Sequence, residues 1–172
     1  MCPNNQEQEV TYNHIMQSTH EFATNDRDSL TRHQYHFIGG PGGTGKSALI
    51  RKLHAACQSE GLLIAICAAT TLAALSFDGA VTAHSLFGYP VEDEEDVDDL
   101  NPTRCEVKKE RAEFLHEVSV IFWDEYVSND RNLMEAVLEQ LKTLWGKKRY
   151  YVFVCAGNFA QVRECSTLCE TT

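Results

Sequence analysis

A glycine-rich segment, GPGGTGKS at residues 40–47, constrains the fold of this chain more than any other feature of its sequence. It fits the pattern G-x-x-x-x-G-K-[ST] at every position, between an apolar run at 35–38 and a segment at 48–59 whose apolar residues have helical spacing. Glycine lets a backbone wrap closely around a polyphosphate, because no Cβ blocks the approach or the positive-φ turns. The helix that follows points free N–H groups and a partial positive charge at the anion. We therefore predict a nucleoside triphosphate site, rather than a glycine-rich turn that matches the pattern by chance.

The residues of this segment have specific roles in the predicted site. Lys46 is expected to neutralise the β- and γ-phosphates, and Ser47 is expected to hold Mg²⁺. The residues predicted to contact the nucleotide are Gly40, Pro41, Gly42, Gly43, Thr44, Gly45, Lys46 and Ser47.

Two further polar clusters follow apolar runs, and both are expected at the same edge of a sheet. Asp124 and Glu125 end the run at 118–123, where Asp124 would hold Mg²⁺ through water and Glu125 would orient and deprotonate an attacking water. Gln161 follows the run at 150–155 and would sense the γ-phosphate or hold that water. Alternatively, the acid pair is ordinary surface and the second segment is a plain strand-ending turn.

Apolar runs and helical segments alternate along the chain. The predicted strands are 35–38, 62–67, 118–123 and 150–155, and the predicted helices are 7–22, 48–59, 70–76, 82–88, 104–116 and 130–144. Strands that alternate with helices and are apolar throughout specify a parallel sheet covered on both faces. With 172 residues, the chain has the length of one such α/β domain. We expect the strand order 1-4-3-2, with the phosphate loop, the acids and Gln161 along one edge.

The formal net charge of −10 comes largely from one acidic run at 92–99, inside a predicted loop at 91–100. A run of like charges repels itself and is typical of a solvated loop. The seven cysteines are an odd number without a framework spacing, and no apolar segment resembles a signal peptide or a membrane span. We therefore expect reduced thiols, no membrane partner, and an intracellular, soluble protein.

Several motifs together resemble those of the petite-integration-frequency (PIF) type DNA helicases of superfamily one, over essentially the whole chain. The phosphate loop at 39–47 resembles the family's GG-x-G-x-GKS, and the acid pair resembles its magnesium and water motif. The segment at 68–87 follows the family's A-x-T-G-x-A-A and G-x-T-x-H-S-x-F patterns, which generic P-loop enzymes lack. Residues 157–161, GNFAQ, resemble the family's G-D-F-x-Q, and residues 5–8, NQEQ, its N-x-x-Q.

The resemblance implies a RecA-like P-loop NTPase domain with ATP and Mg²⁺ as cofactors. It implies an ATP-dependent DNA helicase that moves 5′ to 3′ along single-stranded DNA, in DNA repair, recombination and telomere maintenance in the nucleus. The family's motifs assign Gln8 to the adenine, and they assign Thr70, Thr82 and His84 to single-stranded DNA. Composition alone would make those last three residues a helix cap and polar surface.

The resemblance also predicts how the chain is organised. Residues 1–33 are expected to form an N-terminal helix with the adenine motif, and residues 34–172 a truncated first RecA-like helicase domain. The family's second domain, with its arginine finger, has no counterpart in this sequence. We therefore expect that the chain alone does not unwind a duplex.

The chain departs from the family pattern in ways that leave a second function open. Asn158 replaces the family's aspartate, which removes a negative charge beside the phosphates, and Thr71 replaces a glycine. With the second domain missing, the alternative is a non-unwinding ATP- or DNA-binding remnant of a transposon helicase. A P-loop kinase or GTPase is not supported, because no N-K-x-D-like base motif or kinase lid is visible. The strand at 35–38 would lie at an open sheet edge, which predicts self-association.

Overall fold

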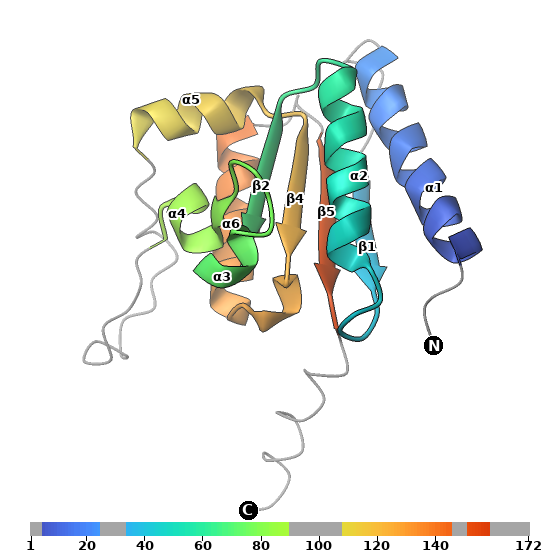
Figure 1. Ribbon diagram of the computed structural model, residues 1–172. Helices are drawn as coiled ribbons and strands as arrows, with labels where there is room; N and C mark the ends of the chain where they lie inside the picture. The colour runs from blue at the N-terminus through green and yellow to red at the C-terminus, as the bar shows by residue number, and fades with distance from the viewer. Residues whose placement is uncertain (1–4, 25–33, 90–107, 146–150, 159–172) are drawn as a thin grey trace, which may run out of the picture.

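The computed structural model describes residues 5–24, 34–89, 108–145 and 151–158. Within these ranges, five strands form one sheet in the order β1-β5-β4-β2-β3, and every neighbouring pair is parallel (Figure 1). The strands are β1 (Gln34–Gly39), β2 (Ile64–Ala68), β3 (Val81–Thr82), β4 (Val120–Asp124) and β5 (Val152–Gly157). The four strands predicted from the sequence are confirmed, and so is their order.

The short strand β3 corrects the prediction that residues 82–88 are helical from their first residue. Val81 and Thr82 pair with the end of β2, and helix α4 (Ala83–Phe87) begins directly after them. Thr82 both ends the strand and caps the helix, because its Oγ1 accepts a hydrogen bond from the N–H of Ser85 at 3.2 Å. A two-residue strand is too short to produce an alternation that a sequence pattern could detect.

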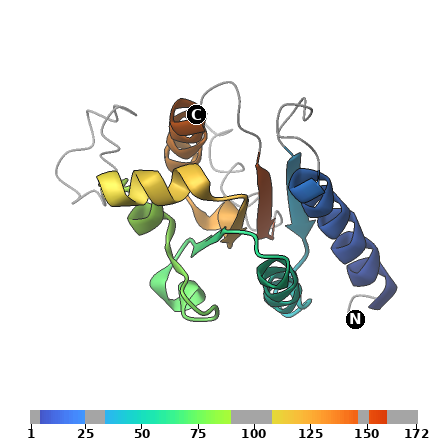
Figure 2. The same cartoon turned by 90° about the horizontal axis from the view of Figure 1, so that it is seen from above.

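Helices cover both faces of the sheet, as the sequence predicts. α1 and α2 lie side by side on one face, and α6 lies on the other (Figure 1; Figure 2). The helices are α1 (Asn5–Thr24), α2 (Lys46–Ser59), α3 (Thr71–Ala74), α4 (Ala83–Phe87), α5 (Lys109–Glu117) and α6 (Arg131–Trp145), with a 3₁₀ turn η2 at Tyr126–Ser128. Of the predicted helix at 104–116, the residues before 108 lie outside the described ranges. Among the described helices, none combines the length and apolarity that a membrane crossing requires.

The central strands β4 and β5 are buried along their whole length. Phe122 and Val154 belong to an apolar cluster with the buried residues of α1 and α2. Trp123 and Phe153 point to the opposite face and belong to a second cluster with the buried residues of α6. Because each strand must fill both clusters, neither can alternate apolar with polar residues, which explains the continuous apolar runs.

Helix α6 forms as its sequence predicts. The Oδ1 atom of Asp130 accepts a hydrogen bond from the N–H of Asn132 at 2.6 Å, so Asp130 caps the helix. Leu133, Val137 and Leu141 are completely buried against the sheet. The spacing of these three side chains places them on one stripe of the helix.

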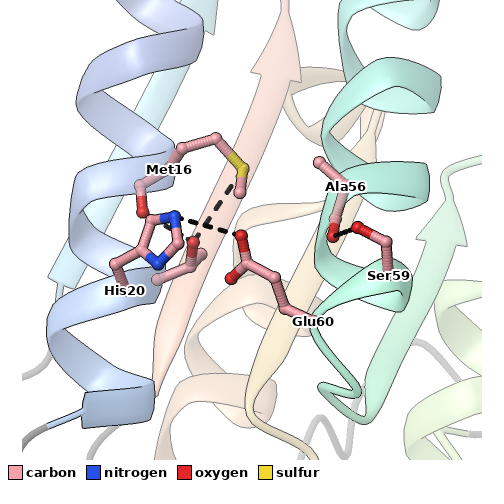
Figure 3. Close-up of polar contacts among 6 residues, drawn as sticks. Met16, His20, Ala56, Ser59 and Glu60 are labelled. Atoms are coloured by element: carbon pink, nitrogen blue, oxygen red, sulfur yellow. Dashed lines mark hydrogen bonds and ion pairs between the residues drawn. The ribbon is translucent and has the colours of Figure 1, made fainter.

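Helix α1 is attached to α2 by both packing and polar contacts. Ile15 is buried between the helices and the sheet. Near the far end of both helices, Nε2 of His20 lies 3.1 Å from Oε1 of Glu60 (Figure 3). The ammonium of Lys52 lies 4.2 Å from the ring centroid of Tyr12, within the range of a cation–π contact. These contacts hold α1 against α2, and the start of α1 reaches the phosphate loop through Gln8.

Three buried cysteines are part of the core, as their apolar surroundings in the sequence predict. Cys57, Cys67 and Cys155 have free thiols. Burial raises the pKa of Cys57 to about 11 and the pKa of the other two thiols further above the usual range. Such thiols are poor nucleophiles at neutral pH.

Strand β1 lies at one edge of the described sheet, as predicted. On the face away from α1 and α2, its side chains are only partly covered: Tyr35 is 55% exposed and Phe37 38% exposed. The hydroxyl of Tyr35 forms a hydrogen bond of 2.9 Å with that of Tyr151. Within the described sheet, β1 pairs on one side with β5, so it is an edge strand that carries exposed aromatic side chains, a combination that favours pairing with another chain.

Strand β1 also carries a histidine that makes the stability of the fold depend on pH. His36 lies edge-on to His14 of α1, with ring centroids 5.2 Å apart, and its Nε2 is buried without a partner among the described residues. Burial, and secondarily His14, lower the pKa of His36 below 6.5. As the pH falls through the unfolded-state pKa, the unfolded chain takes up a proton that the folded chain still excludes, so stability is lost.

We predict that His36→Phe reduces the stability lost between pH 7.5 and pH 5.5. The ring keeps its shape but no longer titrates, and the gain should be at most on the order of 1 kcal/mol, because one pKa unit corresponds to about 1.4 kcal/mol. Urea unfolding of both proteins at the two pH values measures it. An identical loss of stability in the variant would contradict the assignment of this titration to His36.

Candidate nucleotide-binding site

The phosphate loop joins the carboxyl end of β1 to the first turn of α2. Its glycines provide the backbone geometry that the sequence predicts, most clearly at Gly45, where φ is 86°. A Cβ at Gly45 would also lie 2.8 Å from Nε2 of Gln8. The left-handed backbone favours glycine at this position, and a Cβ there would also displace the side-chain amide of Gln8.

Lys46 is held over the loop by the loop's own carbonyl oxygens. Its Nζ donates to the O of Gly40 at 2.7 Å and to the O of Pro41 at 2.9 Å. Thr44 Oγ1 donates to the same Pro41 oxygen at 2.9 Å. The ammonium therefore lies against the concave backbone that the motif assigns to phosphate.

The predicted metal ligands lie together, although they are far apart in the sequence. Ser47 Oγ donates to Oδ2 of Asp124 at 2.8 Å, and Oδ1 of Asp124 accepts from the N–H of Glu125 at 2.9 Å. Asp124 is buried, with 4% of its surface exposed. A hydroxyl beside a carboxylate is an oxygen donor set that suits Mg²⁺ held largely by phosphates and water. Within the described ranges, no group of three or more His, Cys, Asp or Glu residues could hold a metal alone.

Gln8 reaches the phosphate loop from the second turn of α1. Its Nε2 donates to the O of Thr44 at 2.8 Å. Beside it lies a cavity of about 280 Å³ between α1 and the loop, lined in part by Thr11, Pro41 and Leu49. The structure thus places Gln8 beside the loop, where it contacts the backbone as well as the cavity.

Glu125 follows β4 in a strained backbone conformation. Its φ of 52° and ψ of 31° are left-handed, and it is the one non-glycine residue with positive φ in the described ranges. Such a conformation costs a residue with a Cβ about 1–3 kcal/mol and is found mainly at functional sites. The side chain is exposed at the edge of the sheet, next to Asp124.

Strand β5 brings its polar end to the same edge. At Gly157 an added Cβ would lie 2.7 Å from Cγ2 of Val127, so this glycine is required by the close approach of η2. Asn158 follows it and is partly exposed. Gln161, which the sequence assigns to the γ-phosphate or the water, lies outside the described residues.

The three residues assigned to DNA by resemblance lie at or just after the ends of β2 and β3. Thr70 caps α3, because its Oγ1 accepts from the N–H of Ala73 at 3.2 Å, and Thr82 caps α4 in the same way. The ring of His84 is edge-on to that of Tyr89, with centroids 6.0 Å apart. The helix-cap interpretation is therefore confirmed for both threonines, and it leaves their outer surfaces open to a further role.

Sequence reasoning missed two features of this region. Leu72 and Leu75 of α3 are 79% and 77% exposed, which was not predicted from the sequence. Asn129 donates from Nδ2 to the O of Tyr126 at 3.0 Å and to the O of Glu125 at 3.4 Å. Nothing in the sequence pattern distinguishes such an asparagine from an ordinary helix-preceding polar residue.

The fold and the site define a RecA-like P-loop nucleotide-binding domain. Its features are a phosphate loop, a Ser–Asp pair beside that loop, and a parallel sheet in which β5 lies between β1 and β4. Residues 4–166 match the model of the family described as PIF1-like helicase, and the chain belongs to that family. It is 33% identical over 106 residues to the ATP-dependent DNA helicase PIF3 of Trypanosoma brucei brucei (strain 927/4 GUTat10.1).

Solved structures show the same fold. The Pif1 helicase from Candida albicans superposes with a TM-score of 0.62 at 23% identity, over 92% of this chain and 33% of that one. Pif1 from Bacteroides in complex with ADP-AlF3 and ssDNA gives a TM-score of 0.61 at 20% identity, over 97% of this chain and 36% of that one. The match to PIF3 covers 62% of this chain and 12% of that protein, so the chain spans only part of its relatives.

We predict that Gly157→Ala destabilises the fold by about 1–3 kcal/mol, because the added methyl overlaps Val127 in a packed region. In Val127→Ala, the space for that methyl is available, so the double variant should recover most of the loss. Urea unfolding of both single variants and the double variant measures the coupling between the two sites. Additive losses would show that η2 and the end of β5 do not press on each other.

Proposed function

We propose that this chain is the nucleotide-binding motor domain of an ATP-dependent DNA helicase that moves 5′ to 3′ on single-stranded DNA. The observation that carries the proposal is the 2.8 Å hydrogen bond between Ser47 and Asp124, directly beside Lys46. It joins the phosphate loop to the strand-ending acids, which is the arrangement that phosphoryl transfer from a Mg²⁺-bound triphosphate requires. Family membership supports ATP as the nucleotide and DNA as the polymer.

The proposed roles follow from chemistry and position. Lys46 binds the β- and γ-phosphates, while Ser47 and Asp124 hold Mg²⁺, which neutralises charge on the phosphates when bound. Glu125 orients an attacking water and accepts its proton, and Gln161 senses the γ-phosphate. Gln8, beside the cavity of about 280 Å³, recognises the adenine.

Single-stranded DNA is the proposed partner of the surface formed by Thr70, Thr82 and His84. All strands are parallel, so the ends of β2 and β3 lie at the same edge as the phosphate loop. A polymer on that surface would therefore sense changes at the nucleotide. A related Bacteroides Pif1 structure is described as bound to ssDNA, which supports this class of partner.

The wider setting is also a proposal. We place the protein in the nucleus, in DNA repair, recombination and telomere maintenance, with residues 1–33 as the adenine-recognition segment and residues 34–172 as the first RecA-like domain. The alternative, a non-unwinding ATP- or DNA-binding remnant of a transposon helicase, is favoured by one feature. Asn158 stands where the family has an aspartate, which changes the charge beside the phosphates.

We predict that Lys46→Ala abolishes Mg·ATP binding and the ATP hydrolysis that single-stranded DNA stimulates, because the phosphates lose their cation. Calorimetry measures binding, and phosphate release measures hydrolysis. Lys109→Ala, which removes an exposed lysine from α5, is the matched control and should behave as wild type. Equal ATP affinity in wild type and Lys46→Ala would contradict the proposed site. Wild-type binding without hydrolysis would favour the remnant.

We also propose that the chain self-associates through β1. Lysine on an edge strand opposes pairing with another chain, so the double variant Tyr35→Lys, Phe37→Lys should be monomeric where wild type is not. Sedimentation velocity over a concentration series measures this. Leu63→Lys, at another exposed apolar residue, controls for added charge. A wild-type chain that remains monomeric at every concentration would contradict the proposal.

A further inference from the structure

The turn that follows β4 holds Glu125 in a conformation that its side chain does not favour. Left-handed backbone with φ of 52° brings the Cβ of an L-residue close to its own carbonyl oxygen. The residue is not glycine, asparagine or aspartate, the types that tolerate this region best. The conformation therefore has to be maintained by contacts of the surrounding turn.

Five hydrogen bonds of this turn start or end at residues 125 and 126. Glu125 N–H donates to Oδ1 of Asp124 at 2.9 Å, and Glu125 O accepts from the N–H of Ser128 at 2.9 Å. Tyr126 O accepts from the N–H of Asn129 at 3.2 Å and from its Nδ2 at 3.0 Å. The same Nδ2 lies 3.4 Å from Glu125 O, so one amide group spans two consecutive carbonyls.

The remainder of the turn is anchored by packing against the core. The ring of Tyr126 is perpendicular to that of Trp123, with centroids 5.0 Å apart, and it also contacts Phe153. Val127 fills the space that the missing Cβ of Gly157 leaves. Tyr126 and Val127 are held by these contacts. The backbone angles of Glu125 are therefore set by the orientation of the carbonyl groups of Glu125 and Tyr126.

We infer that Asn129 is a positioning residue for ATP hydrolysis: its side-chain amide fixes the carbonyls of Glu125 and Tyr126, and thereby aims the carboxylate of Glu125 along the edge of the sheet. This inference rests on the proposed function, in which Glu125 acts on the attacking water. Asn129 itself does not reach the reacting atoms. The simpler interpretation is that Asn129 only ends η2 and contributes to stability.

The decisive variants are Asn129→Ala and Asn129→Asp. Asn129→Ala removes the side-chain amide, whereas Asn129→Asp keeps the shape of the side chain but replaces the donor with an acceptor that faces two carbonyl oxygens. The matched control is Gln140→Glu. Gln140 also donates from its side-chain amide to a backbone carbonyl, that of Phe87 at 3.1 Å, but on α6. The control therefore loses the same kind of bond and gains the same charge at another place in the fold.

Single-turnover ATP hydrolysis, calorimetric Mg·ATP affinity and melting temperature are measured for each protein, with activity assayed well below every melting temperature. Both Asn129 variants should hydrolyse ATP at least about tenfold more slowly, with an affinity within about twofold of wild type, because the phosphate loop and the Ser47–Asp124 pair are untouched. Gln140→Glu should lower the melting temperature without slowing hydrolysis.

Three outcomes would overturn the inference, and they are distinguishable from one another. If wild type hydrolyses ATP and the Asn129 variants match its rate, Asn129 has no positioning role and the proposed function stands. If wild type hydrolyses no more ATP than Lys46→Ala, the proposed function fails, and the inference fails with it. If Gln140→Glu has the same melting temperature as the Asn129 variants and hydrolyses ATP as slowly as they do, the inference is also rejected.

Discussion

The insertion of β5 between β1 and β4 is the constraint on which the rest of the structure depends. Because the chain places its last described strand in the middle of the sheet, β1 and β4 are held two strand spacings apart. That separation lets the hydroxyl of Ser47, at the start of α2, meet the carboxylate of Asp124 at 2.8 Å. β1 and β4 both pair in parallel with β5. Their carboxyl ends therefore cannot separate without breaking the backbone hydrogen bonds between these strands and β5.

The same insertion couples the site to the core on each face. Phe122 and Val154 pack below α1 and α2, so α2 is fixed while its N-terminus faces the phosphate loop. α1 is held by buried side chains such as Ile15 and by polar contacts at its surface, such as His20 with Glu60. Surface contacts of the polar kind are weak individually, so the buried side chains provide most of the attachment of α1 and thereby hold Gln8 beside the phosphate loop.

Sequence reasoning predicted which residues come together at this site but not the fine geometry of their contacts. The loop, the acids and the strand order were predictable because glycine spacing and apolar runs report directly on backbone freedom and burial. The positive φ of Glu125 and the amide of Asn129 were not, because both depend on contacts between residues that no period relates. Strand β3 was missed for the same reason. Its two residues pair with β2 because the fold brings this segment beside that strand, and their own sequence shows no strand pattern.

The contacts of the site also indicate where the free energy of nucleotide binding has to arise. Lys46 has two carbonyl partners, Ser47 has Asp124, and Gln8 has the O of Thr44. A ligand that engages these groups exchanges one set of hydrogen bonds for another, and each exchange yields a net gain of only about 0.5–1.5 kcal/mol. Lys46 also gives up its carbonyl partners, but these carry no net charge, so its attraction to a polyphosphate exceeds the interactions that it loses. Affinity should therefore depend far more on that charge than on the neutral contacts around it.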